Sequence, residues 1–181
     1  MIVSAGRDST VRVWDISQGR EVSKFLGHKG HVCALAVTAQ GLIVSGGQDS
    51  TVKLWDPRSK VPAASRAMFS PGAAVTNLIA SRETGSVIAT GADGLVCVAT
   101  PSSLEILHQW GGDHSNFIYT TEATGGGYVL TGGGEGSLSV RREDGTIIST
   151  TKIDDNAVRG VGLTDSGTIV IITDDGNLVT L

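Results

Sequence analysis

Three side chains in the first third of the sequence have the residue types of a hydrolase triad. His28, Ser45 and Asp49 supply an imidazole, a hydroxyl and a carboxylate within one short segment. In a triad the carboxylate orients the imidazole, which takes the proton of the attacking hydroxyl. That chemistry also needs donors for an oxyanion, and the sequence implies none. A catalytic Asp-His-Ser arrangement is therefore the weaker interpretation, and a structural role for these side chains is the stronger one.

Metal and phosphate chemistry have similarly weak signals. The segment HKGHVC brings His28, His31 and Cys33 close in sequence, as zinc ligands are, but alternate residues of a strand face opposite ways. The Gly-rich segments GGGEGS and TGGGY lack the lysine of a phosphate-binding loop. The acidic turns DNAVRG and TDDGN offer few calcium ligands. We expect no enzymatic activity, no metal and no cofactor.

Composition narrows the class of protein further. A net charge of −4 in 181 residues argues against nucleic-acid binding, which needs a basic surface. No apolar run approaches the roughly 20 residues of a membrane span. Strand-like sequence follows Met1 directly, so we expect no signal peptide. Cys33 and Cys97 lie in apolar runs and are predicted to be buried free thiols of a reducing, cytoplasmic compartment.

The sequence repeats itself at a fixed period. IVSAGRDSTVRVWD, residues 2–15, returns as IVSGGQDSTVKLWD, residues 43–56, with ten of fourteen positions identical. Five acidic residues mark successive turns at intervals of 41, 44, 42 and 40 residues: Asp8, Asp49, Asp93, Glu135 and Asp175. A period of about 40–45 residues is typical of the blades of a β-propeller.

Short strands and tight turns must position these residues. The second repeat contains VCALAVT, LIVSGG and TVKLW, with a weaker fourth strand around ASRAMF. The first of these is small and apolar throughout, which predicts a strand buried on both faces. Counting along the chain predicts groups of three, four, four, four and three strands in an all-β fold.

The second repeat carries a resemblance to a known family. LGH at residues 26–28, followed by VSGGQDSTVKLWD, resembles the WD-repeat β-propellers. The resemblance implies a single partial propeller over residues 1–181, with four-stranded antiparallel blades around a channel and incomplete at both ends. Only the first 56 residues carry the motif strongly. The expected repeats are approximately 1–27, 28–69, 70–112, 113–153 and 154–181.

The resemblance also implies roles for the polar residues. In the family, His28, Ser45, Asp49 and Trp55 would form a hydrogen-bonded tetrad that holds a blade together. Ser4, Asp8 and Trp14 match the last three in the first repeat, where no histidine precedes them. Later repeats depart: Ser70-Pro71 replaces Gly-His and Arg141 replaces the tryptophan. We expect those blades to be held together mainly by backbone pairing and apolar packing.

Four and a half blades leave three interpretations of the whole. The chain could be a fragment of a longer propeller, it could complete a ring with another chain or with copies of itself, or it could close as a ring of five irregular blades. Since exposed strand edges are avoided, the first two interpretations predict a partner or further chain at the open edges.

The resemblance implies a non-catalytic scaffold or adaptor that binds other proteins within a multiprotein complex. One alternative is a structural subunit of a ciliary, cytoskeletal or ribonucleoprotein assembly, bound by its edges and sides. A propeller enzyme is a weaker alternative. In the family, partners dock on the channel rim, where the matching large side chains are Arg7, His31, Phe117, Tyr119 and Arg159. The opposing interpretation is that the aromatic rings pack between blades and the arginines are solvated surface charges.

Overall fold

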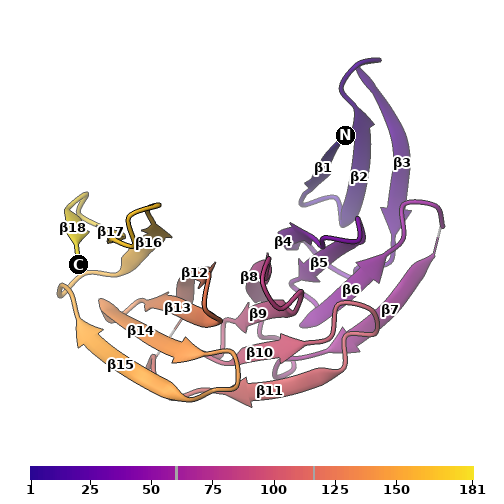
Figure 1. Cartoon of the computed structure of the whole chain (residues 1–181). Helices are drawn as coiled ribbons and strands as arrows, with labels where there is room; N and C mark the ends of the chain where they lie inside the picture. Colours follow the sequence, from indigo (N-terminus) through magenta and orange to yellow (C-terminus); the bar gives the residue numbers. More distant parts are fainter. Residues whose placement is uncertain (60, 116) are drawn as a thin grey trace.

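The chain forms an open arc of five antiparallel β-sheets (Figure 1). This computed structural model describes residues 1–59, 61–115 and 117–181. We number the sheets as blades 1 to 5 in chain order. Blades 2, 3 and 4 have four strands, and blades 1 and 5 have three. The described residues include no helix long and apolar enough to cross a membrane.

The strands follow one another within each blade. They are β1 (Ile2–Ala5), β2 (Thr10–Asp15) and β3 (Arg20–Leu26) in blade 1; β4 (Val32–Val37), β5 (Ile43–Gly47), β6 (Thr51–Trp55) and β7 (Pro62–Ala67) in blade 2; β8 (Val75–Ala80), β9 (Val87–Gly91), β10 (Val96–Ala99) and β11 (Ile106–Trp110) in blade 3; β12 (Ile118–Thr124), β13 (Tyr128–Gly133), β14 (Ser137–Arg142) and β15 (Ile147–Lys152) in blade 4; β16 (Val158–Leu163), β17 (Ile169–Thr173) and β18 (Leu178–Thr180) in blade 5.

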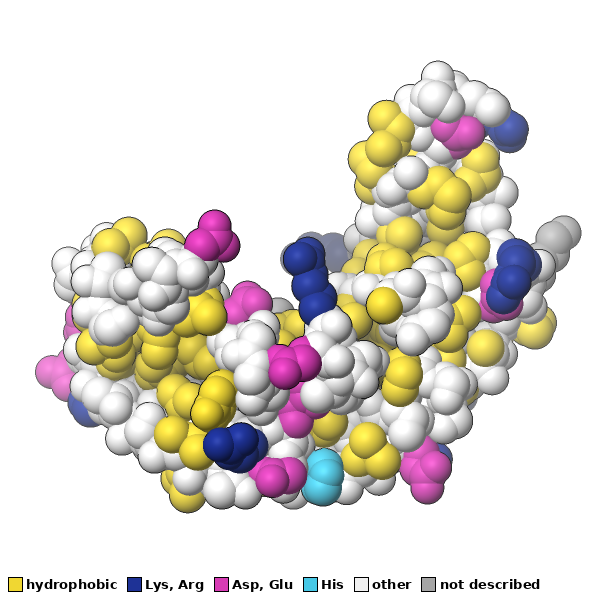
Figure 2. Space-filling view, in the orientation of Figure 1, with side chains coloured by type: hydrophobic (Ala, Val, Ile, Leu, Met, Phe, Trp, Pro, Cys, Tyr) yellow, Lys and Arg dark blue, Asp and Glu magenta, His cyan; other side chains and the backbone are white. Residues whose placement is uncertain are grey.

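The blades are arranged around a common concave side. Figure 1 shows β4, β8, β12 and β16 along the inside of the arc and β3, β7, β11 and β15 along the outside. The two terminal blades lie at opposite ends and do not share a sheet. The hypothesis of a closed five-bladed ring is therefore wrong for this structure. Figure 2 shows apolar side chains gathered on both terminal blades. Four apolar residues of these blades are exposed: Ile2, Leu26, Ile172 and Leu178.

The core consists of apolar interfaces between successive blades. Val44 and Leu54 of blade 2 pack with Val75 and Leu78 of blade 3. Gly46 permits this approach, because a Cβ there would lie 2.3 Å from the Val75 side chain. Blades 4 and 5 pack against each other in the same way, through a cluster of similar apolar side chains. Burial of these side chains is the main stabilising contribution to each interface.

Two local predictions are wrong, and the bounds of a third are displaced. The inner strand β4 is only half-buried, with Val32 its one buried residue, because inner strands face the channel; β5 is the strand buried throughout. Cys97 is buried as predicted, but Cys33 is exposed. The fourth strand of blade 2 ends at Ala67, so that Met68 and Phe69 pack in the core after it.

One buried side chain offers a stabilising substitution. The Thr121 side chain is buried, and its Oγ1 has no hydrogen-bond partner among the described residues. By strand register, Leu35 and Leu78 occupy the same place in blades 2 and 3. Because an unpaired buried hydroxyl is costly, we expect Thr121→Val to raise the free energy of unfolding by about 1 kcal/mol in a urea melt.

Thr120 provides a matched control on the same strand. Its Oγ1 accepts a hydrogen bond of 3.2 Å from the backbone N–H of Val161 in blade 5. Thr120→Val should therefore destabilise the chain. A loss of stability in both variants would show that the Thr121 hydroxyl has a partner.

Candidate functional site

A β-bulge near the start of each inner strand directs one side chain toward the channel rim. In β4, β8, β12 and β16 the register skips the second residue of the strand. The skipped residues are Cys33, Thr76, Tyr119 and Arg159. Bulges commonly re-aim a side chain in this way, and this one explains why Cys33 is exposed despite its apolar neighbours. The same irregularity places Tyr119 and Arg159 on one rim.

The structure brings Phe117, Tyr119 and Arg159 together, with Asp174 beside them; we call these four residues the rim cluster. The rings of Phe117 and Tyr119 have centroids 4.9 Å apart and planes inclined by 35°. The guanidinium carbon of Arg159 lies 3.9 Å from the centroid of the Tyr119 ring. Blade 4 thus supplies the aromatic rings, and blade 5 supplies the cation.

An ion pair fixes the guanidinium over the ring. Arg159 Nε donates to Asp174 Oδ1 at 2.8 Å, and Nη2 donates to Oδ2 at 3.2 Å. The bonds from Arg159 lower the pKa of Asp174. Such an exposed pair contributes little to stability, but its two-pronged geometry orients the arginine. The rim cluster is therefore a preorganised surface of aromatic and charged groups, with Phe117 37% exposed.

A pocket of about 460 Å³ adjoins the rim cluster. Its lining combines the two aromatic rings with small residues and one carboxylate: Ala92, Asp93, Ser115, Phe117, Tyr119 and Gly134. The neighbouring backbone is held in place, because Asn77 Nδ2 of blade 3 donates to the Tyr119 carbonyl at 2.9 Å. The pocket thus lies across the junction of blades 3 and 4.

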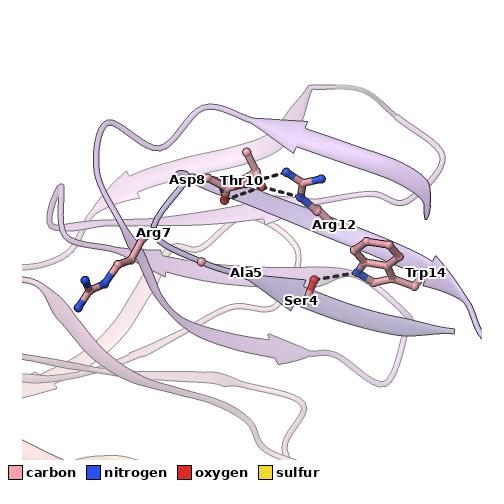
Figure 3. Close-up of a pocket in the computed structure, with 8 residues that line it drawn as sticks. Ser4, Ala5, Arg7, Asp8, Thr10, Arg12 and Trp14 are labelled. Carbon is pink, nitrogen blue, oxygen red and sulfur yellow. Dashed lines mark hydrogen bonds and ion pairs between the residues drawn. The ribbon is translucent and has the colours of Figure 1, made fainter. Parts of the chain in front are cut away.

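Arg7 and His31 lie elsewhere on the rim. Both are exposed, and they are at the junction of blades 1 and 2, where the Val32 N–H donates to the Gly6 carbonyl at 3.1 Å. Figure 3 shows Arg7 pointing away from the hydrogen-bonded residues of its own blade. Neither residue lines the pocket beside Phe117 and Tyr119. The predicted partner-binding residues therefore separate into two groups.

In blade 2 the four predicted tetrad residues form one chain of hydrogen bonds. Trp55 Nε1 donates to Ser45 Oγ at 2.7 Å, and Ser45 Oγ lies 2.8 Å from His28 Nε2. His28 Nδ1 lies 3.0 Å from Asp49 Oδ1. A neutral ring with its proton on Nδ1 satisfies both neighbours. Ser45 has no exposed surface, so its hydroxyl cannot reach a substrate as a triad nucleophile would.

Comparison with known proteins agrees with this geometry. The family model described as "WD domain, G-beta repeat" matches residues 1–15 and 19–56. The crystal structure of the computationally designed protein Ika8 is 26% identical over 98% of this chain and superposes with a TM-score of 0.85. The first two repeats match the WD-repeat family, and the chain as a whole has the fold of a partial β-propeller.

A second solved structure supports the fold alone. The WD40 β-propeller domain of Doa1 is 20% identical over 98% of the chain, with a TM-score of 0.82. The present chain covers 54% of the Ika8 chain and 59% of the Doa1 chain. It thus spans somewhat more than half the length of either chain.

In the tetrad of blade 2, burial and hydrogen bonding favour a neutral His28 beside an ionised Asp49. Burial lowers the pKa of His28, and the bond to Asp49 only partly opposes this effect. Burial alone would raise the pKa of Asp49. Bonds from the Lys29 N–H, Thr51 and His28 outweigh burial and hold that pKa at about 2.

Blade 1 keeps half of the WD-repeat network. Trp14 Nε1 donates to Ser4 Oγ at 2.8 Å, as the equivalent pair does in blade 2 (Figure 3). Without a histidine, Asp8 accepts instead from Arg12 at 2.7 Å and from Thr10 at 2.8 Å. These bonds, led by that from Arg12, lower the pKa of Asp8 to about 2.

Blade 4 adds polar side-chain contacts to the backbone pairing and apolar packing that were expected to be its main support. His114 lies 2.8 Å from Thr131 Oγ1 and 2.5 Å from Glu135 Oε1. Arg141, at the tryptophan position, pairs with Asp113 through two hydrogen bonds, one of them the 2.6 Å Nε–Oδ2 contact. This nearly buried ion pair replaces the indole.

Blade 3 contains a different replacement that sequence reasoning missed. A Cβ on Gly47 would lie 2.4 Å from the His28 ring, and a Cβ on Gly91 would lie 2.3 Å from the Phe69 ring. Phe69 therefore fills in blade 3 the volume that the imidazole fills in blade 2. The sequence signal was the aromatic residue before Ser70-Pro71. As a consequence, Asp93 has no imidazole donor and accepts from the Ser70 N–H at 2.9 Å.

Proposed function

We propose that this chain is a non-catalytic scaffold or adaptor that binds other proteins through the rim cluster, as part of a larger complex and in the cytoplasm. WD40 propeller domains typically mediate protein–protein interaction. The observation that carries the proposal is the preorganised stack of Phe117, Tyr119 and Arg159 on an exposed rim. Aromatic and arginine side chains are enriched among the residues that contribute most to interfaces.

An alternative is a structural subunit that is bound by its edges and sides. Exposed apolar side chains on the outer strands favour it: Leu107 of β11 and Ile147 and Ile148 of β15 are each at least half exposed. These residues lie on the convex side of the arc, away from the rim cluster. The two hypotheses therefore predict different contact surfaces.

A double substitution tests the rim-cluster proposal. Tyr119→Ala with Arg159→Ala should reduce the recovery of specific partners at least about tenfold, since residues of this type often contribute 2 kcal/mol or more to binding. The measurement is a quantitative affinity pull-down with partners identified by mass spectrometry. Circular dichroism should show an unchanged β-sheet signal.

The chain offers a control of the same chemistry. Arg142 lies 5.1 Å from the centroid of the Tyr128 ring, at the other end of the strands of blade 4. Tyr128→Ala with Arg142→Ala should leave partner recovery unchanged. If the folded rim-cluster variant keeps every partner, the rim cluster is not the binding surface.

A further inference from the structure

The pocket beside the rim cluster has one exposed carboxylate against two aromatic rings. In blade 2 the equivalent carboxylate, Asp49, accepts from the ring of His28. In blade 3 Phe69 takes the place of that ring, and among the described residues Asp93 accepts only from the backbone N–H groups of Ser70 and Leu95. Asp93 is exposed. Its carboxylate therefore keeps acceptor capacity that faces the pocket.

The cavity exists because the residues before the turn acids are small at this junction. Ala92 and Gly134 occupy these positions in blades 3 and 4 and line the pocket. Gln48 holds the equivalent position in blade 2, and the Gln48 and Ala92 N–H groups make equivalent backbone bonds to the residue just before the inner strand of their blade. A longer side chain at either position would occupy the space beside Phe117.

The charges around the pocket leave a net negative site. Arg159 is neutralised by its ion pair with Asp174, so Asp93 contributes the remaining charge of −1. The Tyr119 ring already holds the Arg159 guanidinium at 3.9 Å, which shows that an aromatic face at this rim accepts a cation. A cation between an aromatic ring and a carboxylate gains from both interactions.

We infer that this pocket binds a lysine or arginine side chain of the partner protein, with Asp93 as its counter-ion and Phe117 and Tyr119 as its aromatic wall. The inference rests on the proposed docking function and adds the chemical class of the residue bound. A pocket of about 460 Å³ accommodates one long basic side chain. Neutral and acidic side chains would leave the Asp93 carboxylate without a charged partner.

The experiment is an amide-detected NMR titration of the full chain with four acetylated pentapeptides. Each has one central residue between glycine and serine: arginine, lysine, citrulline or glutamate. Citrulline has nearly the shape of arginine without its charge. The arginine and lysine peptides should shift the signals of Asp93, Phe117 and Gly134, and the citrulline peptide should bind at least about fivefold more weakly.

Two variants assign the effect to the pocket. Asp93→Asn should remove the preference for arginine over citrulline. Ala92→Gln introduces the blade 2 residue and should abolish binding while preserving the fold. Asp155→Asn makes the same charge change at a fully exposed side chain and should preserve the preference for arginine.

Three results would overturn the inference. Equal binding of the arginine and citrulline peptides would show that charge is not recognised, and the absence of shifts with every peptide would show that the pocket binds none of these side chains. Light scattering could also show that the wild-type chain associates with itself and that Asp93→Asn does not. That result would assign the pocket to a second copy of the chain. None of these changes the expected loss of partners in the Tyr119 and Arg159 variant, so failure of the docking proposal is detected separately.

Discussion

Arg141→Ala is expected to lower the free energy of unfolding by about 3 kcal/mol, because it leaves the Asp113 carboxylate nearly buried without its counter-ion. The side chains of Arg141 and Asp113 are only 16% and 8% exposed. Arg141 Nη1 also donates to the Gly145 carbonyl at 2.6 Å, and its guanidinium lies 5.9 Å from the Trp110 ring. A urea melt monitored by circular dichroism measures the loss.

A double-mutant cycle distinguishes the ion pair from simple packing. Asp113→Leu alone leaves the guanidinium without its counter-ion and should also destabilise the blade strongly. Arg141→Met combined with Asp113→Leu removes both charges and should cost less than Arg141→Met or Asp113→Leu alone. If the two single losses simply add, the pair does not act as a unit and the account of blade 4 is wrong.

His28→Ala and Asp49→Ala should each cost about 1–3 kcal/mol, because each leaves buried groups of the tetrad unpaired. The combined variant should cost less than the sum, since both residues belong to one hydrogen-bonded chain. Glu135→Ala should cost less than Asp49→Ala. The Glu135 side chain is 25% exposed against 10% for Asp49, and no indole closes its network. Equal losses in a urea melt would show that the residues are wrongly matched.

The tetrad also predicts a loss of stability in acid. Both folded-state pKa values are lowered, so the unfolded chain binds more protons and stability falls as the pH falls. The His28 contribution diminishes below its ordinary pKa of 6.5. The Asp49 contribution diminishes from about its ordinary 3.8 toward about 2. His28→Ala should therefore flatten the stability profile between pH 7 and 5, and an unchanged slope would contradict a neutral, buried His28.

The period of the turn acids, together with the apolar patterns between them, predicted the fold class and the eighteen strands that the described residues form. The positions at which later repeats depart from the motif were harder to interpret. Gly27 lies close to the tryptophan, since a Cβ on it would be 3.1 Å from the Trp55 ring. Asp113 at the Gly27 position and Arg141 at the Trp55 position are therefore a paired replacement. This signal was present in the sequence, but it could be interpreted only with that contact known.

The contacts of the rim cluster could not be predicted from the sequence for a different reason. Alternation along a strand predicts which residues share a face, but a bulge breaks the alternation at Cys33, Tyr119 and Arg159. The family resemblance placed Phe117, Tyr119 and Arg159 on adjacent blades, and the structure shows their contacts. The acceptor capacity of Asp93 became apparent only once the structure placed the Phe69 ring where a histidine lies in blade 2.

Site-specific photocrosslinking tests the central claim, that partners dock on the rim cluster, most directly. A photoreactive phenylalanine analogue is placed at Phe117 in one variant and at Leu107, on the outer strand β11, in another; both side chains are exposed. After irradiation with the partner recovered by the wild-type chain, the rim-cluster proposal predicts a covalent product from position 117 and none from position 107. A product from position 107 alone would contradict it and favour a subunit bound by its sides.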